Sequence, residues 1–141
     1  MFLPDVNVLL YAFRPDGKDH AAHFAWLDAQ VNGAAAYGMS PQVLSAVVRI
    51  STHPRIFVKP SSREQALAFA RAVMSPAHCT LVQPGPNHWM IFEDLCRRAS
   101  ATGNLVQDAW LAALAVESGC EWVTTDRDFA RFPGLRWRTP F

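Results

Sequence analysis

Short apolar runs alternate along the chain with longer segments in which apolar residues recur at helical spacing. Proline and glycine residues separate many of these segments. The alternation is typical of an α/β domain with a mostly parallel sheet. The runs predicted to be strands are Phe2 to Leu10, Ala34 to Met39, Cys79 to Val82, Glu121 to Thr124 and Leu135 to Arg138.

The longer segments predict helices whose ends are marked by capping residues. Ser40 fits an N-cap followed by Pro41 at the first helical position, and this helix closes at Thr52. Further helices are predicted over Asp19 to Val31, Ser62 to Met74 and Asn87 to Ser100.

The strongest helix signal covers Leu105 to Ser118, with Asn104 as N-cap and Gly119 as C-terminal stop. This segment is apolar nearly all round, so the fold should bury it on more than one side. Asp108, in its first turn, should therefore lie in a cleft or in the core.

Composition narrows the class of protein. The chain has 141 residues, half of them apolar, which fits one compact domain over residues 1–141. With 13 Lys plus Arg against 12 Asp plus Glu, the net charge is +1, so any nucleic-acid binding must come from a local patch. The longest uncharged apolar run is too short to cross a membrane, and the three cysteines form no metal or disulfide pattern. A soluble, cytoplasmic protein is expected.

Carboxylates fall at the ends of predicted elements. Asp5 lies in the first apolar run, Asp108 begins the buried helix, and Asp126 and Asp128 follow the Glu121 run. In an open parallel sheet the carboxyl ends of the strands share one edge, where ligands bind. Carboxylates gathered there would repel one another unless a cation joined them, and oxygen ligands select Mg²⁺ or Mn²⁺.

Each carboxylate also has a purely structural interpretation. Asp5 could start a turn with Asn7, Asp108 could complement a helix dipole, and Asp126 could cap a short helix over Arg127 to Phe132. The five histidines offer another chemistry, since a metal-independent enzyme could use a histidine pair as general acid and base. No spacing links them to an orienting carboxylate, so structural roles are expected for them.

Three blocks of the sequence, in this order and spacing, resemble the signature of PIN-domain ribonucleases, and most of all the VapC toxins of type II toxin-antitoxin pairs. The resemblance extends over essentially the whole chain. The blocks are Pro4-Asp5-Val6-Asn7-Val8-Leu9-Leu10, Gly103-Asn104-Leu105-Val106-Gln107-Asp108-Ala109 and Val123-Thr124-Thr125-Asp126-Arg127-Asp128-Phe129.

The resemblance implies a Rossmann-like three-layer α/β/α sandwich whose acidic pocket binds Mg²⁺ or Mn²⁺ and hydrolyses single-stranded RNA. It matches Asp5, Asp108 and Asp126 to the metal-binding aspartates and Asp128 to an accessory carboxylate. The remaining expected contacts are polar groups at the rim and arginines for RNA phosphates, namely Asn7, Thr124, Arg14, Arg49 and Arg127.

One position departs from the family pattern. A Glu is expected on the helix that begins at Ser40-Pro41, and Ala46 stands there instead. A PIN-fold binding or regulatory protein with lapsed catalysis is therefore the alternative, and a phospho-acceptor receiver-like domain ranks third. The resemblance also implies an antitoxin of the VapB type that docks on the apolar first helices. The face formed by Phe24, Leu27 and Val31 could supply that groove or the seam of a homodimer.

Overall fold

Five short strands, all paired in parallel, form the centre of the protein. The computed structural model describes residues 1–141. One sheet has the order β1-β4-β5 and a second pairs β2 with β3. The predicted α/β architecture with a parallel sheet is confirmed. The strands are β1 (Phe2–Pro4), β2 (Tyr37–Met39), β3 (Cys79–Leu81), β4 (Glu121–Val123) and β5 (Trp137–Arg138).

The first predicted strand is corrected by the structure. Only Phe2–Pro4 is extended, and α1 (Val6–Phe13) follows directly. Asp5 ends the strand by acting as the N-cap of α1, with its Oδ1 accepting a hydrogen bond of 2.7 Å from the Val6 amide. A short continuous apolar run fits a buried strand and a buried helix equally well, so the pattern could not reveal this change.

The other predicted helices are present, with small changes at their ends. Ser40 caps its helix as predicted, its Oγ accepting from the Val43 amide. The helix predicted over Asn87 to Ser100 ends two residues earlier, at Arg98. The helix predicted from Leu105 begins at Asn104, with Gly103, at φ 59°, in the N-cap position in place of Asn104. The bounds are α2 (His20–Val31), α3 (Pro41–Ser51), α4 (Arg63–Met74), α5 (His88–Arg98), α6 (Asn104–Ser118) and the 3₁₀ helix η1 (Arg127–Arg131).

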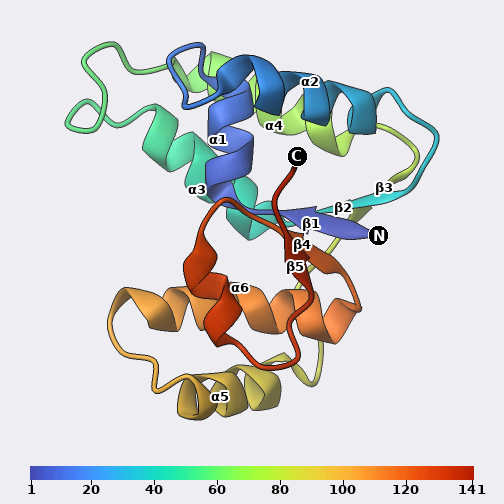
Figure 1. Cartoon of the computed structure of the whole chain (residues 1–141). Helices are drawn as coiled ribbons and strands as arrows, with labels where there is room; N and C mark the ends of the chain where they lie inside the picture. Colours follow the sequence, from blue (N-terminus) through green and yellow to red (C-terminus); the bar gives the residue numbers. More distant parts are fainter.

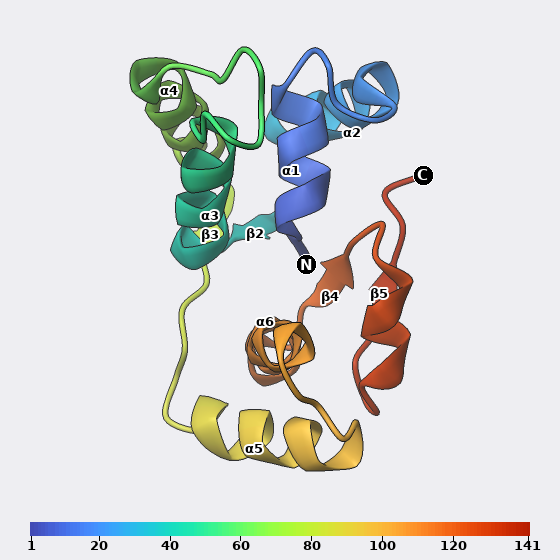
Figure 2. The same ribbon diagram turned by 90° about the vertical axis from the view of Figure 1, so that its left-hand side faces the viewer.

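The helices cover both sides of the strands. In Figure 1, α1 to α4 lie above the strands and α5 and α6 below them. Figure 2 shows α6 end-on beneath β4, with α5 packed on its far side. The residues of α6 that face its neighbours are small or aliphatic and fully or almost fully buried, which confirms the expectation that this helix is enclosed. None of the helices combines the length and apolar character needed to cross a membrane.

The register of β1 with β4 places the ends of both strands side by side. Pro4 pairs with Val123, and the Asp5 amide donates to the Val123 carbonyl at 2.8 Å. The backbone of β2 lies against β1, because a Cβ built on Gly38 would come within 2.9 Å of Leu3 Cδ2. The residues that follow β1, β2 and β4 therefore meet at one edge of the sheets, as expected for parallel strands.

Candidate active site

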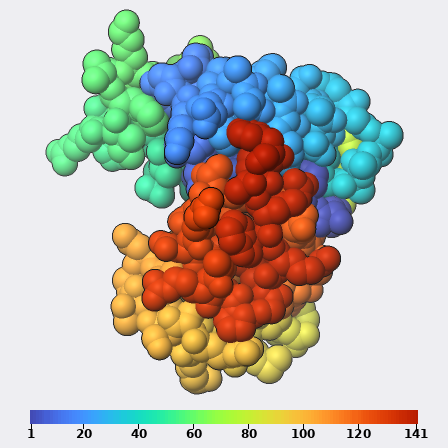
Figure 3. Space-filling view, in the orientation of Figure 1, coloured from blue at the N-terminus to red at the C-terminus, as the bar shows by residue number.

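A cavity of about 650 Å³ opens at this edge between α1, α3 and α6. In Figure 3 the surface is hollowed at the left, between the teal residues of α3 and the orange residues below them. Polar and apolar side chains share the lining. The lining residues are Asp5, Val6, Asn7, Leu10, Tyr11, Gln42, Val43, Ala46, Arg49, Ile50, Asn104, Gln107, Asp108, Leu111 and Asp126.

Asp5 lies at the buried end of the cavity, with 6% of its surface exposed. Its two carboxylate oxygens have different partners. Oδ1 accepts from the Val6 amide, and Oδ2 accepts from the Thr124 hydroxyl at 2.6 Å. Asp5 therefore has a structural role that the sequence did not suggest, as the N-cap of α1, and it also lines the cavity, because the cap uses one oxygen and fixes the direction of the other.

Asp108 and Asp126 reach the same cavity from two other segments. Asp108 is half-buried on α6, one turn into the helix and not in its first turn, because α6 begins at Asn104. Asp126 follows β4 and caps η1, its Oδ1 accepting from the Asp128 amide at 2.9 Å. Asp128 itself is exposed on η1 and is not among the lining residues.

The carboxylates influence one another electrostatically. Burial raises the pKa of Asp5 to about 6, the charges of Asp108 and Asp126 add to this rise, and the hydrogen bonds from Thr124 and Val6 oppose it. Burial also raises the pKa of Asp108 to about 6, with further contributions from the charges of Asp126 and Asp128. Raised pKa values in a cleft are typical of functional carboxylates.

Thr124 connects the two strand ends. This residue is fully buried, and besides donating to Asp5 its Oγ1 accepts from the Asp126 amide at 3.0 Å. Asn7 Nδ2 lies 3.5 Å from the same oxygen, and Asn7 Oδ1 lies 3.5 Å from the Thr125 amide. Asn7 is in the cavity wall, whereas Thr124 lies behind the wall and orients Asp5 and not a ligand.

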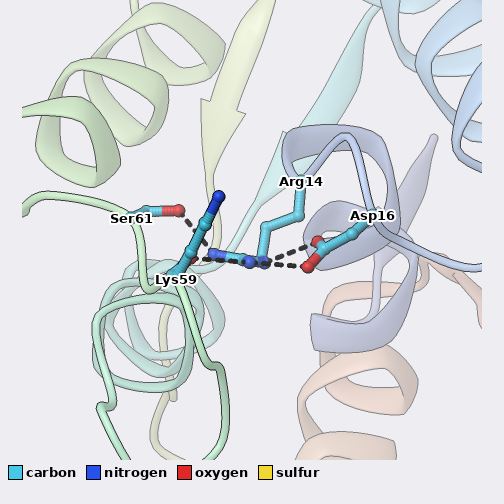
Figure 4. A network of polar contacts seen from close by, with 4 residues as sticks. All are labelled: Arg14, Asp16, Lys59 and Ser61. Carbon is cyan, nitrogen blue, oxygen red and sulfur yellow. Dashed lines mark hydrogen bonds and ion pairs between the residues drawn. The ribbon is translucent and has the colours of Figure 1, made fainter.

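The three arginines that the sequence suggested as phosphate contacts differ in their exposure and in their position relative to the cavity. Arg49 is exposed and is the only cationic side chain that lines the cavity. Arg127 is exposed on η1, outside the lining. Arg14 is 6% exposed, and its guanidinium is taken up by Asp16, the Ser61 hydroxyl and a main-chain carbonyl, as Figure 4 shows. Arg14 thus does not line the cavity, and four of its five guanidinium N–H groups donate within the protein.

Ala46 lines the cavity from α3. The helix therefore directs this position at the acidic residues, and the cavity lacks a carboxylate there because of the residue type and not because of the helix orientation. Gln42, one turn earlier, also lines the cavity and accepts a hydrogen bond of 2.7 Å from Trp110 Nε1.

The donor set suits a hydrated hard cation. The chain has no group of three or more His, Cys, Asp or Glu side chains arranged to hold a metal ion by themselves. Mg²⁺, however, usually keeps several waters and binds through one or two carboxylates together with substrate phosphates. Asp5, Asp108 and Asp126 supply only oxygen donors to one cavity, and their mutual repulsion is what a divalent cation would relieve.

Several polar lining residues were missed by sequence reasoning. Tyr11 was overlooked because the first predicted strand ended at Leu10 and no helix was predicted after it, whereas Tyr11 lies within α1. Asn104 was predicted to be the N-cap, but Gly103 occupies that position, and Asn104 and Gln107 both line the cavity. Helical spacing from Asp108 would have indicated Asn104, four positions earlier, and spacing from Asn104 would have indicated Gln107. None of the five histidines lines the cavity.

Comparison with known proteins agrees with this geometry. Residues 2–135 match the PIN domain family model. Ribonuclease VapC43 of Mycobacterium tuberculosis is 39% identical over 140 residues, covering 99% of this chain and 95% of the relative. Ribonuclease VapC31 of the same species is 41% identical, with 99% of both chains covered.

Solved structures share the fold at low sequence identity. A chain of VapBC2 from Rickettsia felis, bound to a DNA fragment from its promoter, superposes with a TM-score of 0.72 at 17% identity, covering 98% of this chain and 97% of the other. VapBC-1 from nontypeable Haemophilus influenzae gives 0.70 at 14% identity, covering 99% and 97%. Family match, full-length identity and fold agree, and the chain therefore belongs to the PIN-domain family, among the VapC ribonucleases.

Proposed function

We propose that this chain is a metal-dependent endoribonuclease that acts as the toxin of a toxin-antitoxin pair. The observation that carries the proposal is the convergence of Asp5, Asp108 and Asp126, from three separate segments, on one cavity. The raised pKa values of Asp5 and Asp108 add to it. The similarity to VapC ribonucleases over the full length supports RNA as the substrate.

Asp5, Asp108 and Asp126 would hold Mg²⁺ or Mn²⁺. Asp128 is close enough to Asp108 for its negative charge to raise the pKa of Asp108. Such an ion supplies an activated water and neutralises charge on the phosphate during phosphodiester hydrolysis. No histidine, serine or cysteine nucleophile is required, which agrees with the absence of histidines from the cavity.

The protein's own groups position the reacting parts. The Thr124 hydroxyl and the Val6 amide fix the orientation of the Asp5 carboxylate, so this group needs little rearrangement during the reaction. Arg49 places a positive charge at the α3 side of the cavity, where it would contact a phosphate of the RNA. Asn7, Gln42 and Gln107 supply neutral hydrogen-bonding groups along the walls.

The direct test is cleavage of a panel of single-stranded RNAs by the purified chain. We expect cleavage with Mn²⁺ or Mg²⁺, loss of cleavage in EDTA, and no rescue by Ca²⁺, which prefers more ligands at longer distances. Asp108→Asn should be inactive, whereas Asp28→Asn, at an exposed position of α2, should be active. Cleavage that persists in EDTA, or an active Asp108→Asn variant, would contradict the proposal.

A second candidate function follows from Ala46. Because the cavity has alanine where the family pattern has a carboxylate, a PIN-fold regulator that binds RNA or protein without cleaving it is the alternative. The same assay decides between the two functions. Tight RNA binding without cleavage under any metal condition would favour the regulator.

We also propose a VapB-type antitoxin as partner. The matched structures include toxin-antitoxin complexes, and a small apolar groove of about 180 Å³ lies between α1, α2 and α4 of this chain. Phe24 is 54% exposed at this groove, whereas Leu27 is buried and belongs to the core. Phe24→Glu should weaken inhibition by the antitoxin and leave RNA cleavage by the free chain intact.

Homodimerisation stays a prediction, which sedimentation of the free chain would test.

A further inference from the structure

The connection between α3 and α4, residues 52–62, is a compact loop that projects from the body of the protein. In Figure 3 it forms the green prominence at the upper left. Its base is closed by a hydrogen bond of 2.8 Å from the Ser61 amide to the Ser51 carbonyl. Inside the loop, the His53 carbonyl accepts from the amides of Ile56 and Phe57. These bonds give the loop a defined shape although it contains no helix or strand.

Arg14 fastens this loop to the end of α1. Its guanidinium donates to the Lys59 carbonyl and the Ser61 hydroxyl, both at 3.0 Å, and lies 3.6 Å from the centre of the Phe57 ring. Asp16 accepts two further hydrogen bonds of 2.7 and 2.8 Å, which neutralise the buried cation (Figure 4). Removing the guanidinium would break four hydrogen bonds of a buried side chain at once, so Arg14 determines where the loop sits.

The loop carries unpaired positive charge next to the cavity. Arg55 and Lys59 are exposed, and neither takes part in an ion pair. Arg49, also without an ion pair, lines the cavity in the last turn of α3, directly before the loop. The sequence contains no acidic residue between Asp28 and Glu64. The carboxylates therefore line one side of the cavity, and a run of free cations leads away from the α3 side.

We propose that Arg49, Arg55 and Lys59 form a phosphate-binding track, along which a single-stranded RNA runs from the cavity over the loop, and that Arg14 is its positioning residue. The inference rests on the proposed ribonuclease function. Since the net charge is only +1, the whole protein does not attract a polyanion, and an acidic cavity repels one. Local cations beside the cavity are the means by which this chain can hold the RNA backbone.

The test is the salt dependence of RNA binding in EDTA, where cleavage is suppressed. A fluorescently labelled single-stranded oligoribonucleotide is titrated with the full chain at several salt concentrations. For single strands the slope of log K against log salt changes by about 0.7 for each phosphate contact. The double variant Arg55→Ala/Lys59→Ala should therefore flatten the slope by about 1.4. The matched control Arg63→Ala/Arg71→Ala removes two exposed cations of α4 and should leave the slope unchanged.

Arg14→Met tests the positioning role separately. It should accelerate trypsin cleavage of the Arg55–Ile56 bond, and in RNA cleavage it should raise KM with little change in kcat. An unchanged slope in the Arg55→Ala/Lys59→Ala variant, with RNA still bound and cleaved, overturns the track and leaves the ribonuclease function standing. Failure of the unsubstituted chain to bind RNA in EDTA, with RNA still cleaved in Mn²⁺, contradicts the track alone, whereas absence of cleavage in Mn²⁺ contradicts the ribonuclease function. If the double variant binds RNA normally but no longer binds a purified antitoxin, the loop is a protein-docking element and the proposal is wrong.

Discussion

Thr124 shows how one buried hydroxyl sets the properties of the acidic cavity. It donates to Asp5 Oδ2 and accepts from the Asp126 amide, so it fixes two of the three converging segments relative to each other. Its hydrogen bond also lowers the pKa of Asp5 against the larger effect of burial.

Thr124→Val should lower both stability and activity. Because a buried hydrogen bond to a carboxylate is lost, we expect a decrease of about 2 kcal/mol in the free energy of unfolding at neutral pH. The pKa of Asp5 should rise further, which shifts the acid limb of the pH-rate profile to higher pH. Urea unfolding and the pH-rate profile are the measurements. Thr124→Ser keeps the hydroxyl and should keep the profile, so a shifted profile in that variant would contradict this role.

Asp5→Asn should remove part of the pH dependence of stability in metal-free buffer. The carboxyl has a pKa of about 6 in the folded chain against 3.8 as its ordinary value. The folded state therefore binds more protons between these values, and the stabilisation present below pH 3.8 is lost as pH rises through about 6. The change amounts to about 3 kcal/mol.

The asparagine variant lacks this titration, so at neutral pH in EDTA it should be more stable than the unsubstituted chain. In Mn²⁺, where the unsubstituted chain cleaves RNA, the variant should be inactive. Urea unfolding from about pH 4 to pH 7 measures the difference between the two chains. Equal slopes of stability against pH in the two chains would show that Asp5 is not destabilised by burial. Asp28→Asn, on the surface of α2, is the matched control.

At the scale of the elements, α3 determines what the cavity can bind. Its Ser40 cap and Pro41 start fix its first turn, and its inner face brings Gln42, Ala46 and Arg49 to the cavity at spacings of one turn or slightly less. One helix thus contributes three residues to the same wall: Gln42 offers a hydrogen-bonding amide, Ala46 has no polar group, and Arg49 carries a positive charge.

Ala46→Glu should strengthen Mn²⁺ binding, because the new carboxylate faces the carboxylates already present. Calorimetry of the free chain should show one site of higher affinity or a second site, and the metal concentration needed for half-maximal cleavage should fall. Ser45→Glu places the same charge on the neighbouring exposed position, outside the cavity, and should change neither. Two equally tight metal sites in the unsubstituted chain would contradict the deficit at Ala46.

At the scale of the whole molecule, the metal should stabilise the fold, since the three aspartates converge only when α1, α6 and the β4 end are in place. An ion that binds only the folded state raises the free energy of unfolding by about 1.4 kcal/mol for each tenfold rise in concentration above its dissociation constant. Thermal unfolding with increasing Mn²⁺ should show this rise, and Asp5→Asn/Asp108→Asn should not. If the thermal stability of both chains rises equally with Mn²⁺ concentration, metal binding at Asp5 and Asp108 is excluded.

The sequence by itself determined the order of the elements apart from α1, and it indicated the Ser40 cap and the three candidate carboxylates, because periodicity, capping residues and short motifs are local signals. It could not place the end of β1, because the apolar run from Phe2 to Leu10 fits a strand and a helix equally. The pairing of β1 with β4 decided that Thr124 holds Asp5, a contact across 119 positions of the chain. Arg14 was assigned to phosphate and proved to be a buried clamp, since burial and partners depend on which distant segments fold against a side chain.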